Sequence, residues 1–191
     1  MTDRRSPIPT ANATCLKRRN FLKLAACTAA GLLATPALAK IGPLRDRPLA
    51  FYNTHTGETL RTDYWAEGRY LPEGLAEINH ILRDHRTNEV KAIDPRLLDL
   101  LYALQIKLGS RQAFHIISGY RSPATNAALH ANSSGVASHS LHMEGMAADI
   151  FLPDQPLHTL RQAALSLQRG GVGYYPESNF VHVDVGRIRQ W

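Results

Sequence analysis

The chain has 191 residues, a formal net charge of +6 and two cysteines. Residues 1–39 hold six of the 22 Lys and Arg side chains and one of the 16 Asp and Glu, which leaves 16 basic and 15 acidic residues in 40–191. This balance argues against nucleic-acid binding, which needs clustered basic side chains. Both Cys15 and Cys27 precede residue 40, so the remainder has no disulfide and no cysteine-based site. The length allows one domain with a hydrophobic core.

The first 39 residues have the pattern of an export signal. Residues 17–23 carry four basic side chains, residues 24–33 are apolar, and a small-x-small cleavage pattern ends at Ala39. The paired Arg18 and Arg19 resemble a twin-arginine signal, whose route carries proteins that are already folded. We therefore expect a cleavable signal over 1–39, a mature domain over 40–191, and a location in the periplasm.

Two other interpretations of this segment are open. Leu24-Ala25-Ala26-Cys27 resembles a lipobox, which would anchor the chain by lipidation at Cys27. An uncleaved membrane anchor is the weaker alternative, because the apolar run is shorter than the ~20 residues that a spanning helix needs. We expect no stable membrane span in the mature protein.

The first half of the body predicts a hairpin and two helices. Residues 49–53 and 59–64 flank a Gly-containing turn and predict two strands. A helix is expected from Pro72 to about residue 84, with apolar side chains at Leu75, Ile78 and Leu82. After a polar loop over 83–93, Asp94 and Pro95 have the pattern of a helix start. That helix is expected to end before Gly109, with one apolar face made by Leu97, Leu101, Leu104 and Leu108.

The second half predicts most of the strands. Strands are expected over 113–118, 147–152, 172–175 and 180–185. A turn over 119–123, a short helix to His130 and a loop over 131–137 follow the first of these. The last helix is expected over 157–169, with an inner face of Leu157, Leu160, Ala164 and Leu167. Early helices, clustered late strands and short connections predict a single α+β domain with a mostly antiparallel sheet and helices packed on it.

The candidate chemistry lies in the last third of the chain. A catalytic zinc site takes three protein ligands and keeps one position for water, and His142, Asp149 and His182 would make such a set. The spacing from His142 to Asp149 suits a loop histidine followed by a strand aspartate, with Gly145 allowing a close turn. Asp149 lies in an apolar strand, where a carboxylate needs a cation, a metal or several donors. Alternatively, backbone donors alone satisfy Asp149 and the domain is structural, without a metal.

His182 and Asp184 are two residues apart on an expected strand, so their side chains point to the same face. A carboxylate in that position can orient the histidine ligand or take a proton from metal-activated water. Both roles for Asp184 are open from the spacing.

The motifs around these residues resemble a known superfamily. Ser140-x-His142-x-x-Gly145-x-Ala147-x-Asp149 resembles the SxHxxGxAxD signature of the zinc peptidases that include D-Ala-D-Ala carboxypeptidases, VanX dipeptidases and hedgehog-like domains. Residues 118–122, Ser-Gly-Tyr-Arg-Ser, resemble the turn of this superfamily whose arginine contacts the substrate. The resemblance implies a hedgehog/DD-peptidase-like α+β fold.

The likeness extends from about Arg47 to Trp191. Gly-Gly-Val-Gly-Tyr-Tyr-Pro at 170–176 and Phe-Val-His-Val-Asp at 180–184 are similar to the periplasmic murein endopeptidases of the MepK type. The resemblance implies an enzyme that cuts peptide cross-links of peptidoglycan, particularly between two diaminopimelate residues, in cell-wall remodelling. It also implies one Zn²⁺ ion bound by His142, Asp149 and His182, with Arg121 and Ser140 near the substrate.

One departure leaves the catalytic base open. Many relatives have Glu or Asp three residues before the third ligand, where this chain has Asn179. We favour Asp184 as the base; the other candidates are Glu177, Glu144, His139 and His85. Arg121 could stabilise the oxyanion, hold a substrate carboxylate in a forked pair, or brace its own turn.

Two further functions compete with the endopeptidase. A D-Ala-D-Ala-type carboxypeptidase would release a terminal residue instead of cutting a cross-link. A zinc-containing domain could bind peptidoglycan without hydrolysing it, and Asn179 keeps this alternative open. The sequence does not determine the oligomeric state.

Overall fold

The computed structural model describes residues 46–132 and 137–191. The expected signal over 1–39 and the alternative lipidation site Cys27 lie outside the described residues. The described chain is an α+β domain, as expected, in which one sheet carries helices.

The elements follow in chain order. The strands are β1 (Arg47–Asn53), β2 (Thr59–Ala66), β3 (Arg69–Tyr70), β4 (Phe114–Ser118), β5 (Ala147–Phe151), β6 (Gly171–Tyr175), β7 (Phe180–Asp184) and β8 (Arg189–Gln190). The helices are α1 (Pro72–Ile81), α2 (Pro95–Leu108), α3 (Pro123–Asn132) and α4 (Leu157–Leu167), with a short 3-10 helix η2 (Leu141–Glu144). The two-residue strands β3 and β8 and the helix η2 are absent from the sequence prediction.

The sheet is mixed, with the order β3-β2-β1-β4-β5-β7-β6-β8. β1 pairs with β4 in parallel, and so does β6 with β8, whereas the other neighbouring pairs are antiparallel. The hairpin of β1 and β2 is confirmed. The chain then passes through α1 and α2 before β4 returns beside β1, which is the long crossover that a parallel pair requires.

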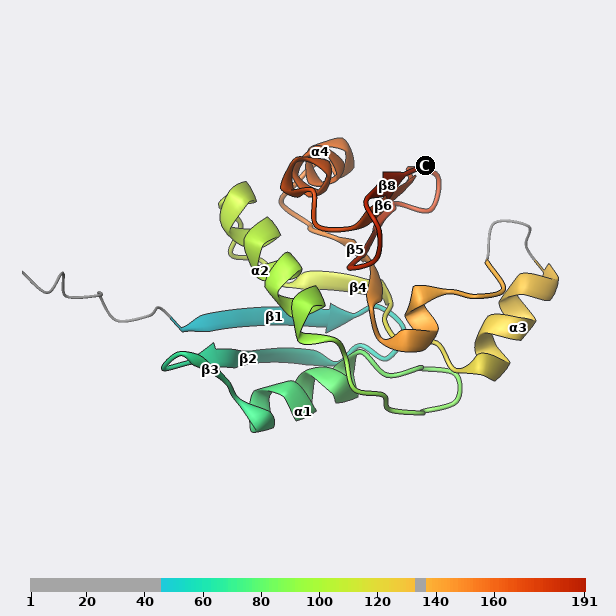
Figure 1. Cartoon of the computed structure of the whole chain (residues 1–191), viewed down its shortest axis with the longest axis horizontal. Coiled ribbons are helices and arrows are strands. Elements are labelled where there is room, and N and C mark those ends of the chain that lie inside the picture. Colours follow the sequence, from blue (N-terminus) through green and yellow to red (C-terminus); the bar gives the residue numbers. More distant parts are fainter. Residues whose placement is uncertain (1–45, 133–136) are drawn as a thin grey trace, which may run out of the picture. The chain divides into compact units, whose positions relative to one another are not determined.

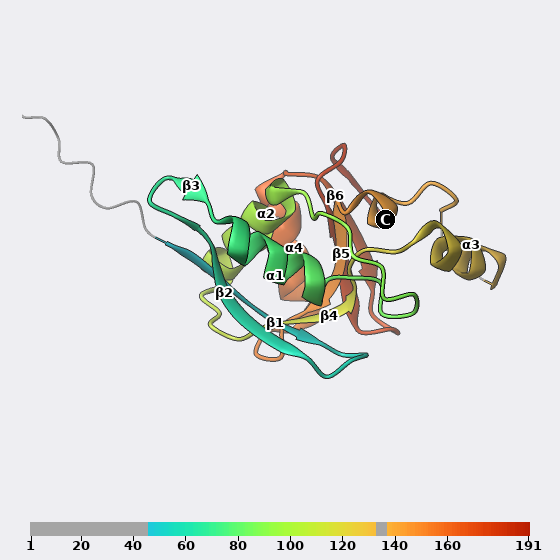
Figure 2. The ribbon, with the colours of Figure 1, turned by 90° about the horizontal axis from the view of Figure 1, so that it is seen from below.

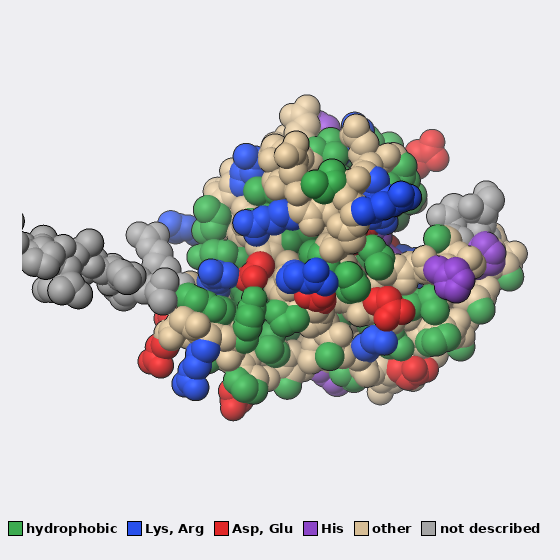
Figure 3. Space-filling model, viewed as in Figure 1, with side chains coloured by type: hydrophobic (Ala, Val, Ile, Leu, Met, Phe, Trp, Pro, Cys, Tyr) green, Lys and Arg blue, Asp and Glu red, His purple; other side chains and the backbone are tan. Residues whose placement is uncertain are grey.

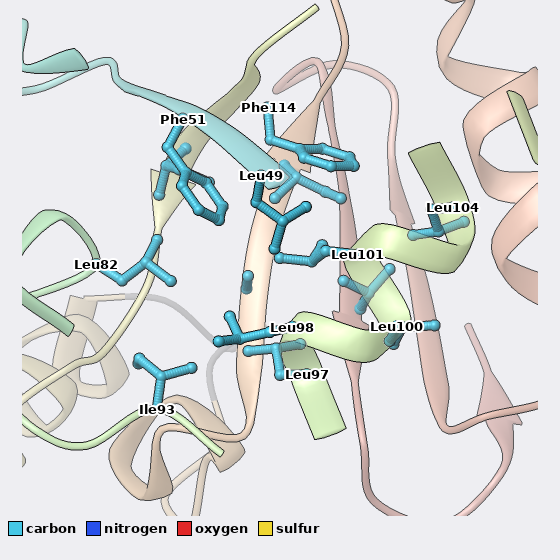
Figure 4. Close-up of a cluster of buried hydrophobic side chains, with 14 of the residues drawn as sticks. Leu49, Phe51, Leu82, Ile93, Leu97, Leu98, Leu100, Leu101, Leu104 and Phe114 are labelled. Carbon is cyan, nitrogen blue, oxygen red and sulfur yellow. The ribbon is translucent and has the colours of Figure 1, made fainter. Parts of the chain in front are cut away.

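The helices α1, α2 and α4 lie together on one face of the curved sheet, and α3 lies apart from them (Figures 1 and 2). One hydrophobic core joins these three helices to the strands. The helix α2 contributes much of it through Leu97, Leu98, Leu100, Leu101 and Leu104 (Figure 4). This helix has the predicted ends, because the Asp94 side chain accepts a hydrogen bond from the Arg96 N–H at 2.9 Å and Gly109 is left-handed.

Some boundaries and inner faces differ from the prediction. The helix α1 ends at Ile81, not near residue 84, because the carbonyl of Leu82 accepts the N–H of Tyr120 from a distant turn. The helix α4 ends at Leu167, where the left-handed Gln168 follows it. The helix α3 runs to Asn132, two residues beyond His130. Four leucines expected in the core stay partly exposed, and they are Leu75, Leu108, Leu157 and Leu167.

Basic and acidic side chains are interspersed over the face shown in Figure 3, which agrees with the nearly balanced charge of the body. Among the helices that the structure describes, none has the length and apolar character that a membrane crossing requires.

A buried carboxylate fixes the turn that follows β4. Asp84 is 1% exposed and accepts hydrogen bonds from the N–H groups of Ser122 at 2.8 Å and Arg86 at 2.9 Å. Burial alone would raise the pKa of Asp84, but these bonds and one from Thr125 hold its pKa well below the usual range. The turn therefore depends on an ionised Asp84.

We expect Asp84→Asn to lower the free energy of unfolding by about 1–3 kcal/mol at pH 7, since a buried N–H loses its charged acceptor. Because the folded pKa of Asp84 is lowered, its contribution is present above the unfolded pKa and is lost as pH falls below about 4. Urea unfolding of both proteins should therefore show a difference at pH 7 that shrinks at pH 3. The exposed Asp63→Asn is the matched control, and an equal loss in both variants would contradict this role.

Candidate metal centre

Two neighbouring strands place two of the three predicted ligands side by side. Asp149 on β5 lies directly opposite His182 on β7 in the antiparallel register. Directly opposite residues of a sheet have their side chains on the same face. Asp184, two residues after His182, lies on that face too, as the strand period predicts, because its Oδ2 is 3.1 Å from His182 Nε2.

The third predicted ligand comes from a short helix, where the spacing predicts a loop. His142 lies in η2, and its N–H donates to the side chain of Ser140 at 3.4 Å. The helix ends at Gly145, whose φ is +68°, and a Cβ there would lie 2.5 Å from the carbonyl oxygen of Ala92. Only glycine fits this turn, which brings His142 back to the sheet.

The three ligand atoms form a small triangle. His142 Nε2 lies 3.2 Å from Asp149 Oδ1 and 3.2 Å from His182 Nδ1, and His182 Nδ1 lies 2.8 Å from Asp149 Oδ1. Tetrahedral zinc with bonds of about 2.0–2.1 Å would separate its ligand atoms by about 3.3 Å. The triangle is therefore close to the size that a zinc ion requires.

Partners on the outer side of each imidazole determine which nitrogen faces the centre as an acceptor. His142 Nδ1 is 2.7 Å from the carbonyl oxygen of Gly119, which can only accept, so Nδ1 carries the proton. His182 Nε2 likewise faces the carboxylate of Asp184. In their neutral forms the two rings would direct two lone pairs at a carboxylate oxygen, and three converging acceptors fit a cation. Burial alone would lower the pKa of His182, but the hydrogen bonds to Asp149 and Asp184 raise it.

The centre is buried. His142 is 1% exposed, Asp149 3% and His182 8%. Burial lowers the pKa of His142, which favours the neutral ring that a metal ligand needs. Burial alone would raise the pKa of Asp149, but His142 and His182 hold it far below its usual range. A deprotonated carboxylate is the form that binds a metal.

Arg121 contacts the centre instead of pointing freely at a substrate. Its NH2 group makes a short ion pair with Asp149 Oδ2, and its Nε donates to Ser118 Oγ at 2.8 Å. These bonds leave Asp149 Oδ1 facing the two histidines. Arg121 thus joins its own turn to the carboxylate of a predicted metal ligand.

Asp184 lies behind His182, on the side away from the three ligand atoms. It is fully buried and accepts hydrogen bonds from the N–H groups of Gly171 at 3.0 Å and Gly186 at 2.8 Å. The guanidinium of Arg189 donates to both of its oxygens, at 3.1 and 2.7 Å. Burial alone would raise the pKa of Asp184, but His182 and these donors hold it below the usual range.

A cleft of about 490 Å³ opens over the three ligands. The predicted substrate residues Arg121 and Ser140 line it, and so does His139; Asp184, Glu144 and Glu177 do not. The ring of His85 stacks on His55 at 3.8 Å instead. The sequence prediction does not include five lining residues from the C-terminal strands and their turns, namely Tyr175, Ser178, Phe180, Arg189 and Trp191. The pattern of residues 170–176 carries the family resemblance but does not reveal that Tyr175 faces the cleft.

Known proteins are similar to this chain in sequence. Residues 43–191 match the family model described as peptidoglycan L,D-endopeptidase MepK. The chain is 47% identical over 175 residues to the peptidoglycan L,D-endopeptidase MepK of Escherichia coli (strain K12), covering 91% of this chain and 96% of the relative. It is 41% identical over 161 residues to a probable peptidoglycan L,D-endopeptidase MepK of Haemophilus influenzae, covering 84% and 87%.

We expect Zn²⁺ to bind the purified domain and raise its Tm, and His142→Ala to abolish both effects, because a buried site with two ligands left is incomplete. Calorimetric titration with Zn²⁺ and thermal unfolding measure them. His158→Ala, an exposed histidine at the start of α4, is the matched control. Unchanged Zn²⁺ binding in His142→Ala would place the metal elsewhere.

Proposed function

This chain belongs to the family of the peptidoglycan L,D-endopeptidase MepK, and on that premise we propose that it is a zinc-dependent endopeptidase that cuts diaminopimelate–diaminopimelate cross-links in peptidoglycan. The observation that carries the proposal is the buried triangle of His142, Asp149 and His182 at the cleft. The names of the relatives supply the substrate class.

The residues of the site have different roles in the proposed hydrolysis of the amide. When bound, zinc would activate a water molecule and polarise the amide carbonyl. His142, Asp149 and His182 would hold it, while Arg121 fixes the orientation of Asp149. Ser140 lines the cleft beside them and supports η2.

We assign Asp184 the role of orienting His182, the second of the two roles open from its spacing. Its two oxygens are occupied by Gly171, Gly186, Arg189 and His182, and it does not line the cleft. A proton acceptor must lie within hydrogen-bond reach of the proton it takes. Among the base candidates, His139 lines the cleft, and we propose that it takes the proton from the attacking water.

The location follows from the substrate. Peptidoglycan lies outside the cytoplasmic membrane, so we propose a periplasmic enzyme in cell-wall remodelling. The twin-arginine route and cleavage after Ala39 remain predictions on residues outside the described ranges.

We predict that the zinc-loaded 40–191 protein cuts cross-links in purified peptidoglycan, so that a later muramidase digest yields more monomers. Mass analysis of the muropeptides should show the loss of diaminopimelate-linked dimers, and a chelator should stop it. Release of a terminal D-Ala without loss of dimers would favour a carboxypeptidase. A folded, zinc-loaded protein that binds peptidoglycan and cuts nothing would favour the non-catalytic binding domain.

Asp184→Asn separates the two roles considered for Asp184. If Asp184 orients His182, the variant should lose about 10–100-fold in Zn²⁺ affinity, because an amide holds the imidazole less firmly. If Asp184 is the base, the Zn²⁺ affinity should be unchanged while kcat falls. Competition with a coloured chelator measures the affinity, and muropeptide release at saturating Zn²⁺ measures kcat.

His139→Ala should lower kcat by roughly 10²–10⁴-fold with unchanged Zn²⁺ affinity, as expected for loss of a positioned base. Glu144→Gln is the matched control, because Glu144 is exposed, lies near Lys91 and does not line the cleft. Full activity of His139→Ala would refute this assignment.

A further inference from the structure

One wall of the cleft is aromatic, and the proposed hydrolysis assigns no role to these aromatic side chains. Trp191, Tyr175 and Phe180 line it. The rings of Tyr175 and Phe180 stack with centroids 4.5 Å apart, and Trp191 Nε1 donates to the Tyr175 hydroxyl at 2.7 Å. These contacts join the three side chains into one surface, which we call the aromatic wall.

The sheet places Trp191 beside a metal ligand. Its N–H donates to the carbonyl of Val172, and its own carbonyl accepts the N–H of Tyr174 at 3.1 Å, so its backbone pairs with β6. Gly173 lies opposite His182 in the register, and a Cβ on Gly173 would lie 2.7 Å from the indole. With no side chain in between, the Trp191 ring comes to 5.2 Å from the His182 ring.

The indole is held in place although it is half exposed. Its exposed fraction is 48%, and the guanidinium of Arg189 lies 4.8 Å from its ring centroid. The same guanidinium is fixed on Asp184 by two hydrogen bonds. An exposed apolar face that is rigidly held, next to the reacting centre, is typical of a surface that binds a ligand.

The position of the wall limits which part of the substrate it can touch. An extended residue spans at most about 3.6 Å, so a ring 5 Å from a ligand ring contacts the residues that flank the cleaved bond. The glycan lies further along the stem peptide. If the proposed function is right, the flanking residue is diaminopimelate, whose two amino-acid centres are joined by a chain of methylenes. Methylenes gain free energy when they are buried against an aromatic face.

We propose that the aromatic wall is a specificity subsite for the methylene arm of the diaminopimelate next to the cleaved bond, and that Trp191 is its specificity-determining residue. The inference rests on the proposed function for the identity of the arm. Arg121 and Ser140 line the same cleft.

Two synthetic cross-linked peptides test the subsite: one with diaminopimelate on both sides of the bond, and one with 2,4-diaminoglutarate on one side, which keeps both amino-acid centres but lacks most of the methylenes between them. The wild type should favour the first by roughly tenfold or more in kcat/KM. Trp191→Ala should reduce this preference to about twofold, mainly through KM, and Trp191→Phe should keep most of it. Ile188→Ala, in the same segment, 66% exposed and outside the cleft, is the control.

Binding to the chelated protein separates the two proposals, because peptide affinity can then be measured without cleavage. If the chelated wild type prefers the first peptide and Trp191→Ala loses this preference, the subsite is supported, whether or not the zinc-loaded protein cuts the peptides. A zinc-loaded protein that cuts neither peptide would overturn the proposed function. Equal binding of both peptides by the wild type, or a preference that Trp191→Ala retains, would overturn the subsite.

Discussion

A buried carboxylate between two imidazole nitrogens is the constraint on which the site depends. Asp149 Oδ1 lies 2.8 Å from His182 Nδ1 and 3.2 Å from His142 Nε2, with 3% of the residue exposed. Ionised and desolvated, it needs positive charge on both sides. Arg121 supplies this at the outer oxygen, and a metal ion would supply it at the inner one. The contacts around Asp149 orient Arg121 and the two histidines.

The fold meets the constraint by joining distant parts of the chain. The pairing of β5 with β7 supplies the aspartate and one histidine, while the turn at Gly145 delivers the other. The turn after β4 adds Arg121, and the Asp84 carboxylate stabilises that turn by accepting the N–H of Ser122. The pairing of Trp191 with β6 adds the aromatic wall. Each predicted ligand is oriented by a partner on its outer side.

The sequence was sufficient where the determining contacts are local. The ends of α2 followed from Asp94 and Gly109, and the three ligand candidates followed from spacing and from the cost of burying Asp149. The sequence was insufficient where contacts between distant segments determine the structure. The parallel pairing of β1 with β4 leaves no local pattern, and neither does the capture of the Leu82 carbonyl by Tyr120. The role of Asp184 stayed open because its donors Gly171 and Arg189 are joined to it only by the fold.

Anomalous diffraction at the zinc edge from crystals grown with Zn²⁺ would show whether the buried triangle of His142, Asp149 and His182 is the metal centre. We expect one strong peak at about 2.0–2.2 Å from His142 Nε2, Asp149 Oδ1 and His182 Nδ1. The ligand atom of His182 is the sharpest part of this prediction, because Asp184 occupies Nε2. A peak next to Nε2 of His182, or at another cluster of side chains, would refute this metal centre.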